Sequence, residues 1–172
     1  MRLGLAAGIM ALAVAPAVAA DGDIWRVYPV DGGGGTIAAL APGEADSPEP
    51  YWGFSMTCMP NQDWTANVSG IDARALGSAI SADESITVAV IADDNPDRTP
   101  ISGFFPAISF GEMYGEWEYA VPFGLDALDE LGSAETLAVK GTGVDFSLPS
   151  KDTEAAFAQF RALCAALPAA NQ

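Results

Sequence analysis

The chain has 172 residues, with 23 acidic residues, seven basic residues and no histidine, so its formal net charge is −16. This charge disfavours nucleic acid and anionic lipid as partners, because both would be repelled. The absence of histidine excludes the Ser-His-Asp triad, the Cys-His pair and the usual zinc sites.

Residues 1–20 have the features of a cleaved signal peptide. Arg2 provides a positive start, and the apolar run from Leu3 to Val14 is followed by small residues up to Ala20. We expect cleavage after Ala20, which leaves one globular domain, residues 21–172, in the periplasm or secreted. The apolar run is short for a bilayer and no other run approaches its length, so we predict no stable membrane insertion after cleavage. Cleavage removes one basic residue and no acidic one, which changes the charge to −17.

The first half of the mature chain predicts three strands. Ile24 to Tyr28 is the first, and the glycine run after it is a turn, because it lacks the Gly-Lys-Ser/Thr ending of a phosphate loop. Residues from Trp52 to Cys58 and from Trp64 to Ser69 alternate between apolar and polar, which predicts a hairpin. The alanine-rich stretch from Ile71 to Ile80 is ambiguous and has at most a helical turn.

The second half predicts five more strands. Ile86 to Ile91 is the most apolar of them, so we expect it at the centre of a sheet, buried on both faces. The other strands are expected at Ile101–Phe110, Trp117–Val121, Leu137–Val139 and Val144–Leu148.

Two helices are predicted. Leucines at 125, 128 and 131 recur at helical spacing before Gly132, which indicates a short helix. A second helix should start at about Lys151, after the strand that Pro149 ends, with Ser150 as its N-cap. Its apolar stripe consists of Phe157, Phe160, Leu163, Cys164 and Leu167.

These elements predict the fold class. The connections are too short for the crossovers of a parallel sheet. We therefore predict an α+β domain that is mainly antiparallel β, a bent sheet or sandwich of about eight strands, with one short helix and a C-terminal helix packed on the sheet.

The two cysteines, Cys58 and Cys164, predict one disulfide, since the chain is expected to be exported. Cys58 lies on the apolar face of its strand and Cys164 lies on the helical stripe, so both point toward the same core. The bond would connect the last helix to an early strand. The chain-entropy model gives at most about 4 to 5 kcal/mol for a loop of this length.

Asp93, Asp94 and Asp97 offer several oxygen ligands within one turn, which is the chemistry that calcium prefers. The spacing is not that of an EF-hand, and Pro96 interrupts it. A turn between two strands, built from turn-forming residues, is the favoured interpretation. We therefore predict no metal site, with the calcium turn as the alternative.

Between Arg98 and Lys140 the chain has seven acidic residues and no basic one. Of these, Glu112, Glu116 and Glu118 are a candidate partner surface that would attract a basic protein in a salt-dependent way. Solvated side chains without a partner are the alternative. Glu116 and Glu118 also share a strand face, with Cα atoms about 6 to 7 Å apart. The polar face of an edge strand has the same pattern, so no catalytic residue is predicted.

Five aromatic residues lie in or beside the predicted strands, and they form either a ligand-binding face or part of the core. Alternation places most of them in the core. They are Tyr51, Trp52, Trp64, Trp117 and Tyr119.

The tail Phe146-Ser147-Leu148, followed by Ala155-Ala156-Phe157 and Phe160, resembles the closing strand and helix of the invasion-associated locus B family of bacterial exported proteins. The resemblance covers about twenty residues. It departs from the family pattern at Ser150, where the family has glycine, and the family's additional cysteines are absent. The resemblance implies an envelope-localised, non-enzymatic domain and assigns no functional residue.

The sequence thus predicts an exported, non-enzymatic accessory or binding protein of the cell envelope, without a cofactor, whose partner is an envelope protein or a small ligand. One alternative is a carboxylate-dependent hydrolase acting on envelope glycans, which requires two convergent acids with one raised pKa. A structural calcium-dependent module is the second alternative.

Overall fold

The computed structural model has ten antiparallel strands and three helices within the residues that it describes. The described residues are 23–32, 35–44, 53–60, 64–104, 106–111, 116–150 and 153–167. The predicted signal peptide lies outside them. None of the helices in these ranges has the length and apolar character needed to cross a membrane. The predicted α+β class is confirmed.

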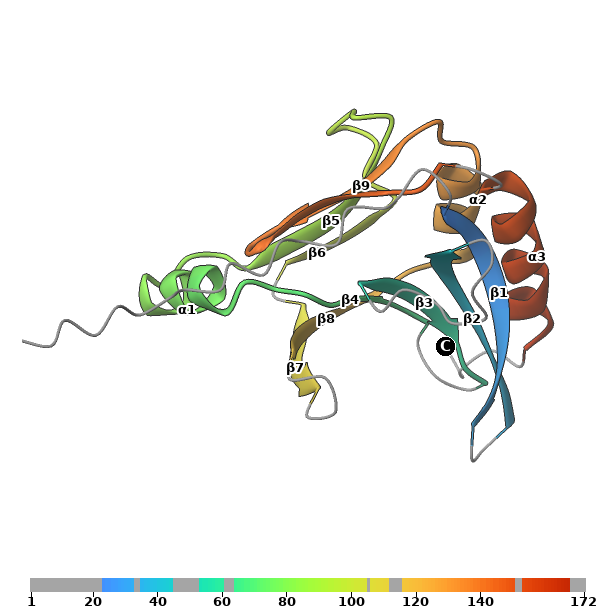
Figure 1. The fold of residues 1–172 in the computed structure, drawn as a ribbon, viewed down its shortest axis with the longest axis horizontal. Coiled ribbons are helices and arrows are strands. Elements are labelled where there is room, and N and C mark those ends of the chain that lie inside the picture. The colour runs from blue at the N-terminus through green and yellow to red at the C-terminus, as the bar shows by residue number, and fades with distance from the viewer. Residues whose placement is uncertain are drawn as a thin grey trace, which may run out of the picture.

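The larger sheet has six strands in the order β1-β2-β3-β4-β8-β7 (Figure 1). Its first four strands follow one another along the chain, and β8 returns beside β4 after the chain has formed β5 and β6, two of the four strands of the second sheet. The strands are β1 (Asp23–Gly32), β2 (Gly35–Glu44), β3 (Phe54–Cys58), β4 (Thr65–Val68), β8 (Glu116–Pro122) and β7 (Ala107–Gly111).

The smaller sheet has four strands in the order β10-β9-β5-β6. They are β10 (Val144–Leu148), β9 (Leu137–Gly141), β5 (Thr87–Ala92) and β6 (Ile101–Phe104). The central place of β5 is confirmed. Its burial on both faces is wrong: Val88, Val90 and Ala92 are buried, but the residues between them are partly exposed. The reason is that the six-stranded sheet packs against one face only (Figure 1).

The strand count differs from the expected eight in two places. β2 lies where the sequence predicts no strand, because its Gly, Ala and Pro residues have weak strand propensity. Pairing overrides that propensity, since β2 is in register with β1 along ten positions and also pairs with β3. The expected strand Ile101–Phe110 is two strands, β6 and β7, with Pro106 between them.

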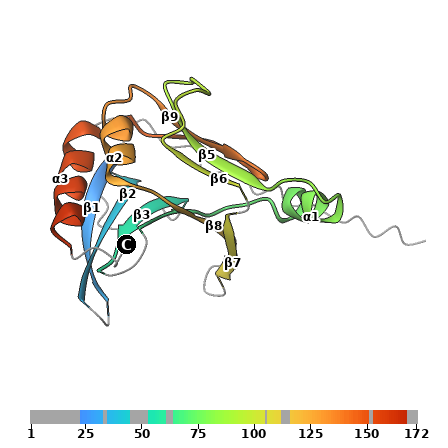
Figure 2. The ribbon, with the colours of Figure 1, turned by 180° about the vertical axis from the view of Figure 1, so that it is seen from behind.

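The helices are α1 (Ala73–Ser81), α2 (Leu125–Gly132) and α3 (Thr153–Ala166). α1 is a full helix where the sequence indicates at most a turn. Its N-cap is Asp72, whose Oδ1 accepts a hydrogen bond of 2.8 Å from the Arg74 backbone N–H. α2 is confirmed as predicted. α3 lies beside α2 and packs against β1 and β2 (Figure 1 and Figure 2). Residues 151–152, where α3 was expected to start, lie outside the described part.

One cluster of buried side chains joins both sheets and all three helices. Near α3 its centre is Trp25, whose ring centroid lies 5.9 Å from that of Phe54 and 4.9 Å from that of Phe157. The Trp25 indole Nε1–H donates a hydrogen bond of 2.7 Å to the Pro149 carbonyl. The apolar stripe of α3 is narrower than expected, because Leu163 is 43% exposed.

Tyr119 joins the two sheets. Its ring is fully buried in the core, and its hydroxyl donates a hydrogen bond of 2.7 Å to the carbonyl of Thr142, in the β9–β10 turn. Burial raises the pKa of Tyr119 above its ordinary value. The same turn is fixed to β5, because the Thr142 backbone N–H donates to the Thr87 carbonyl at 2.8 Å.

The predicted disulfide is present between Cys58, at the end of β3, and Cys164 on α3. The two Cα atoms are 5.6 Å apart, and both residues are fully buried. The bond therefore connects the last helix to the six-stranded sheet, as the sequence predicts.

Candidate functional site: an acidic loop and a projecting hairpin

The candidate residues from the sequence lie at two ends of the molecule. Asp93, Asp94 and Asp97 belong to the β5–β6 loop, residues 93–100. Glu116 and Glu118 belong to the hairpin formed by β7 and β8. Figure 1 and Figure 2 both show the loop at the upper side of the molecule and the hairpin at the lower side. Glu112 lies outside the described residues.

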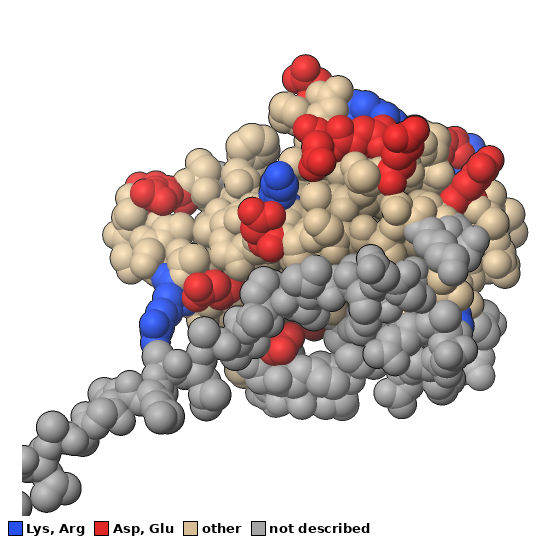
Figure 3. Space-filling view, turned by 45° about the horizontal axis from the view of Figure 1, so that its top comes forward, with Lys and Arg blue, Asp and Glu red and all other residues tan. Residues whose placement is uncertain are grey.

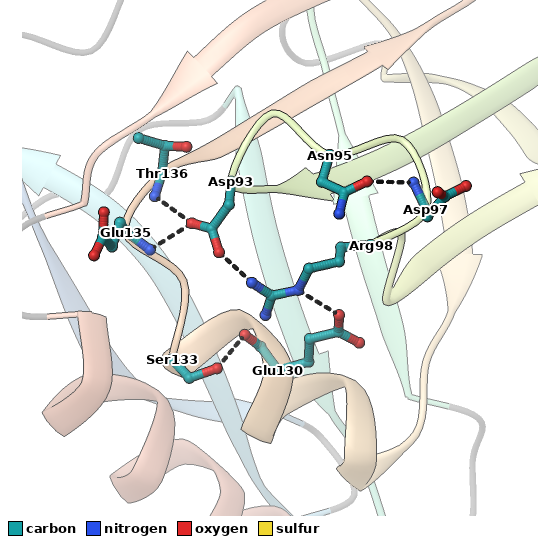
Figure 4. A network of polar contacts seen from close by, with 8 residues as sticks. All are labelled: Asp93, Asn95, Asp97, Arg98, Glu130, Ser133, Glu135 and Thr136. Carbon is teal, nitrogen blue, oxygen red and sulfur yellow. Dashed lines mark hydrogen bonds and ion pairs between the residues drawn. The ribbon is translucent and has the colours of Figure 1, made fainter.

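The β5–β6 loop packs over α2 and the connection from α2 to β9. Asp93 Oδ1 accepts hydrogen bonds from the backbone N–H groups of Glu135 (2.7 Å) and Thr136 (3.1 Å). Its other oxygen, Oδ2, pairs with Arg98, and Arg98 Nε donates at 3.1 Å to Glu130 Oε1 (Figure 4). The Asp93 carboxylate thus has partners on both oxygens.

These contacts shift the titration of Asp93. The pKa of Asp93 is lowered below its ordinary value of 3.8. The backbone hydrogen bond from Thr136 has the largest effect, and the hydrogen bond from Glu135 and the positive charge of Arg98 add to it. A general acid of a glycan hydrolase needs the opposite shift. Asp93 therefore acts as a structural carboxylate.

The loop backbone also explains why aspartates occur here. Asp93 and Asp94 have φ angles of 55° and 49°, in the left-handed region that Asp and Asn tolerate better than most residues. Asn95 Oδ1 accepts a hydrogen bond of 3.0 Å from the Asp97 N–H. These are the features of a turn, the interpretation that the sequence favours.

The calcium alternative gains no support from this geometry. The carboxylates of Asp93 and Asp97 point away from each other, on different sides of Arg98 (Figure 4). Among the described residues, no group of three or more His, Cys, Asp or Glu side chains is placed to hold a metal ion. The calcium turn of Asp93, Asp94 and Asp97 stays a prediction.

Acidic side chains gather across the upper part of one face, with few basic side chains among them (Figure 3). Two arginines of the described residues form ion pairs: Arg98 pairs with Asp93 and Glu130, and Arg161 Nε lies 2.7 Å from Asp129 Oδ1. These ion pairs involve only three of the carboxylates, so the net charge of −16 stays largely uncompensated.

The β7–β8 hairpin projects from the opposite end (Figure 1). Phe110 on β7 is directly across from Trp117 on β8, and their ring centroids are 5.2 Å apart. Phe110 is 48% exposed and Trp117 is partly buried. Trp117 packs against the core cluster, and Phe110 is the exposed ring of the pair.

The two described glutamates of the candidate partner surface lie on the other face of β8 and differ in their surroundings. Glu116 is exposed. Glu118 is partly buried, and its Oε1 accepts a hydrogen bond of 3.1 Å from the hydroxyl of Ser69, itself a buried residue. Glu118 therefore has a role in holding the end of β4, whereas Glu116 is available to a partner.

Sequence reasoning missed Phe104 and Phe110, which are 76% and 48% exposed. Both were placed within one expected strand. Pro106 was the available signal, because proline inside a strand pattern indicates an edge or a break. Of the five aromatic residues that could form a ligand face, Tyr119 is in the core, Trp64 and Trp117 are partly buried, and Tyr51 and Trp52 lie outside the described residues.

A groove of about 330 Å³ lies between β1 and the first half of α3. Its lining contains no carboxylate, so it lacks the two acids that a glycan hydrolase requires. The lining residues are Trp25, Arg26, Val27, Ala155, Ala156 and Gln159.

No protein-family model, curated protein or solved structure matches the chain. The resemblance of the tail to the invasion-associated locus B family therefore stays a prediction.

Proposed function

We propose that the chain is an exported, non-enzymatic accessory or binding protein of the cell envelope, and that it binds its partner through the β7–β8 hairpin. The observation that carries this proposal is the exposed Phe110, which packs edge-to-face against Trp117 on one face of the hairpin, while the exposed Glu116 lies on the other face. Aromatic side chains are enriched at protein interfaces, whose rims are polar.

The buried disulfide supports export, because disulfides persist in oxidising compartments such as the periplasm. The net charge of −16 supports a basic partner, which it would attract at low ionic strength. The hydrolase alternative is not adopted, since neither the groove beside α3 nor the Asp93 network provides the acids it needs.

A capture experiment tests the proposal. Mature protein on beads is incubated with an envelope extract of its source organism at low and moderate salt, and the retained proteins are identified by mass spectrometry. We expect a retained protein that moderate salt releases. The hairpin variants Phe110→Ser and Glu116→Gln should retain less of it.

Two matched controls make the result specific. Phe104→Ser removes an even more exposed phenylalanine from the other sheet, and Asp94→Asn removes one exposed carboxylate from the far end. Both controls should capture as the unsubstituted protein does. Retention of nothing specific, or equal loss in the controls, would reject the hairpin as the binding surface.

A further inference from the structure

The edge of the six-stranded sheet at β7 is open in the described part of the chain. β7 pairs with β8 on one side and with no described strand on the other. An open edge presents unpaired backbone N–H and C=O groups, which are a template for another strand.

β7 lacks the features that usually protect such an edge. Its five residues, Ala107 to Gly111, include no charge and no proline. Its register with β8 runs without interruption from Ala107 to Gly111, so no bulge turns the edge away. Natural edge strands normally use one of these devices to prevent pairing with other chains.

The side chains of β7 differ between its two faces. Ile108 and Phe110 lie opposite Tyr119 and Trp117, on the apolar face. Small residues occupy the other face, where Ser109 is opposite Glu118 and Gly111 is opposite Glu116. Small side chains leave the exposed carboxylate of Glu116 within reach of a strand added beside β7, which would lie about 10 Å from β8, or two strand spacings. Glu118 shares this face but is bonded to Ser69 on the side of β4.

We propose, on the basis of the function proposed above, that β7 accepts an extended segment of another protein as a seventh strand, and that this segment alternates apolar and basic residues. Its apolar side chains would extend the Phe110–Trp117 surface. Its lysine or arginine side chains would lie on the face of Glu116 and Glu118. Strand period sets this alternation, because successive side chains point to opposite faces.

Charge decides between a foreign segment and a second copy of this chain. Two copies paired through β7 would each bring Glu116 and Glu118 to the shared edge, and each copy has a net charge of −16. Like charges at such short range oppose the pairing. A basic segment removes this repulsion and supplies the opposite charge.

A peptide experiment tests the inference with the full mature chain. The probe is a synthetic eight-residue peptide in which lysine alternates with valine and phenylalanine. One comparison peptide has the same composition with the lysines grouped together, and another has glutamate in place of lysine. Affinity is measured by calorimetry at low and moderate salt, and amide hydrogen exchange is followed by NMR for each residue of β7.

The alternating peptide should bind at least tenfold more tightly than the grouped one, and the glutamate peptide should not bind. Every second amide along Ala107–Gly111 should gain protection, since only alternate N–H groups of an edge strand face a new neighbour. Phe110→Ser and Glu116→Gln should each weaken binding, whereas Phe104→Ser and Asp94→Asn should leave it unchanged.

Each other outcome is decisive. Equal binding of alternating and grouped peptides, or protection without alternation along β7, overturns strand addition and leaves the binding function standing if the capture experiment succeeded. Concentration-dependent dimerisation of the chain with the same alternating protection identifies a second copy as the occupant and also overturns the proposal. Absence of both peptide binding and captured protein rejects the proposed function as well.

Discussion

Two regions of this molecule contain carboxylates beside strand ends, and they use them differently. At the β5–β6 loop, Asp93 is satisfied by two backbone N–H groups and by Arg98, so its charge holds the loop onto α2 and β9. At the β7–β8 hairpin, Glu116 is exposed on one face and Phe110 is exposed on the other. Acidic residues thus stabilise the fold at one end and remain available at the other.

Removing the disulfide tests whether the β5–β6 loop depends on the helices α2 and α3. Replacing Cys58 and Cys164 together with alanine should lower the free energy of unfolding by up to about 4 to 5 kcal/mol, measured by urea titration. Protection of the Thr136 amide against hydrogen exchange should fall more than that of the Phe110 amide. The reason is that Thr136 follows α2, which packs on α3, the helix held by the disulfide. A larger loss of amide protection at Phe110 than at Thr136 would contradict this prediction.

A substitution at Gly141 tests the close packing of β9 against β5, the strand that leads into the β5–β6 loop. A Cβ atom at this position would lie 2.3 Å from the Thr87 carbonyl oxygen and 2.7 Å from the Val88 Cα. Gly141→Ala should therefore lower the free energy of unfolding by about 1 to 3 kcal/mol. Gly77→Ala in α1 is the matched control, since nothing lies within 4 Å of its Cβ position, and it should stabilise by about 0.5 to 1 kcal/mol. Equal changes of melting temperature in Gly141→Ala and Gly77→Ala would refute the close approach of the backbone at Gly141.

Tyr119 couples the two regions, because it lies on the hairpin strand β8 and bonds to the turn of the other sheet. Tyr119→Phe keeps the ring and removes the hydrogen bond to Thr142. We expect a loss of about 0.5 to 1.5 kcal/mol in the free energy of unfolding. Unchanged stability would mean that packing alone joins the sheets.

Asp93→Asn should lower the melting temperature at pH 7 by less than the preceding changes, because it keeps one acceptor oxygen and removes only the charge that faces Arg98. The pKa of Asp93 is lowered in the fold, so its stabilisation is complete above its ordinary value of 3.8 and is lost as pH falls through the folded pKa. The difference in melting temperature between the variant and the original protein should therefore shrink below about pH 4. A difference that grows on acidification would refute the lowered pKa.

Glu116→Gln should have the smallest effect on folding, within about 0.5 kcal/mol of the free energy of unfolding, because the side chain is exposed. The same change should reduce partner capture. A large loss of stability in a urea titration would show that Glu116, like Asp93, is needed by the fold, and the difference between the two regions would disappear.

Local pattern predicted much of this fold. Period-two alternation predicted the β3–β4 hairpin, and the strands β9 and β10 were also expected. Apolar positions on β3 and α3 predicted the bond between Cys58 and Cys164. Tertiary pairing determined the parts that were missed, such as β2, whose composition gives no strand signal. The candidate site was harder to predict from the sequence. The exposure of Phe110 and the hydrogen-bond partner of Glu118 both depend on how the strands pack in three dimensions.

The bond between Cys58 and Cys164 also determines the order of covalent assembly. The two residues are 106 positions apart, so every element from β4 to β10 is synthesised before the second sulfur exists. With only two cysteines in the chain, there is a single intramolecular pairing and no mispaired isomer to correct. Formation of this bond therefore requires an electron acceptor for one thiol pair and no catalyst of disulfide rearrangement.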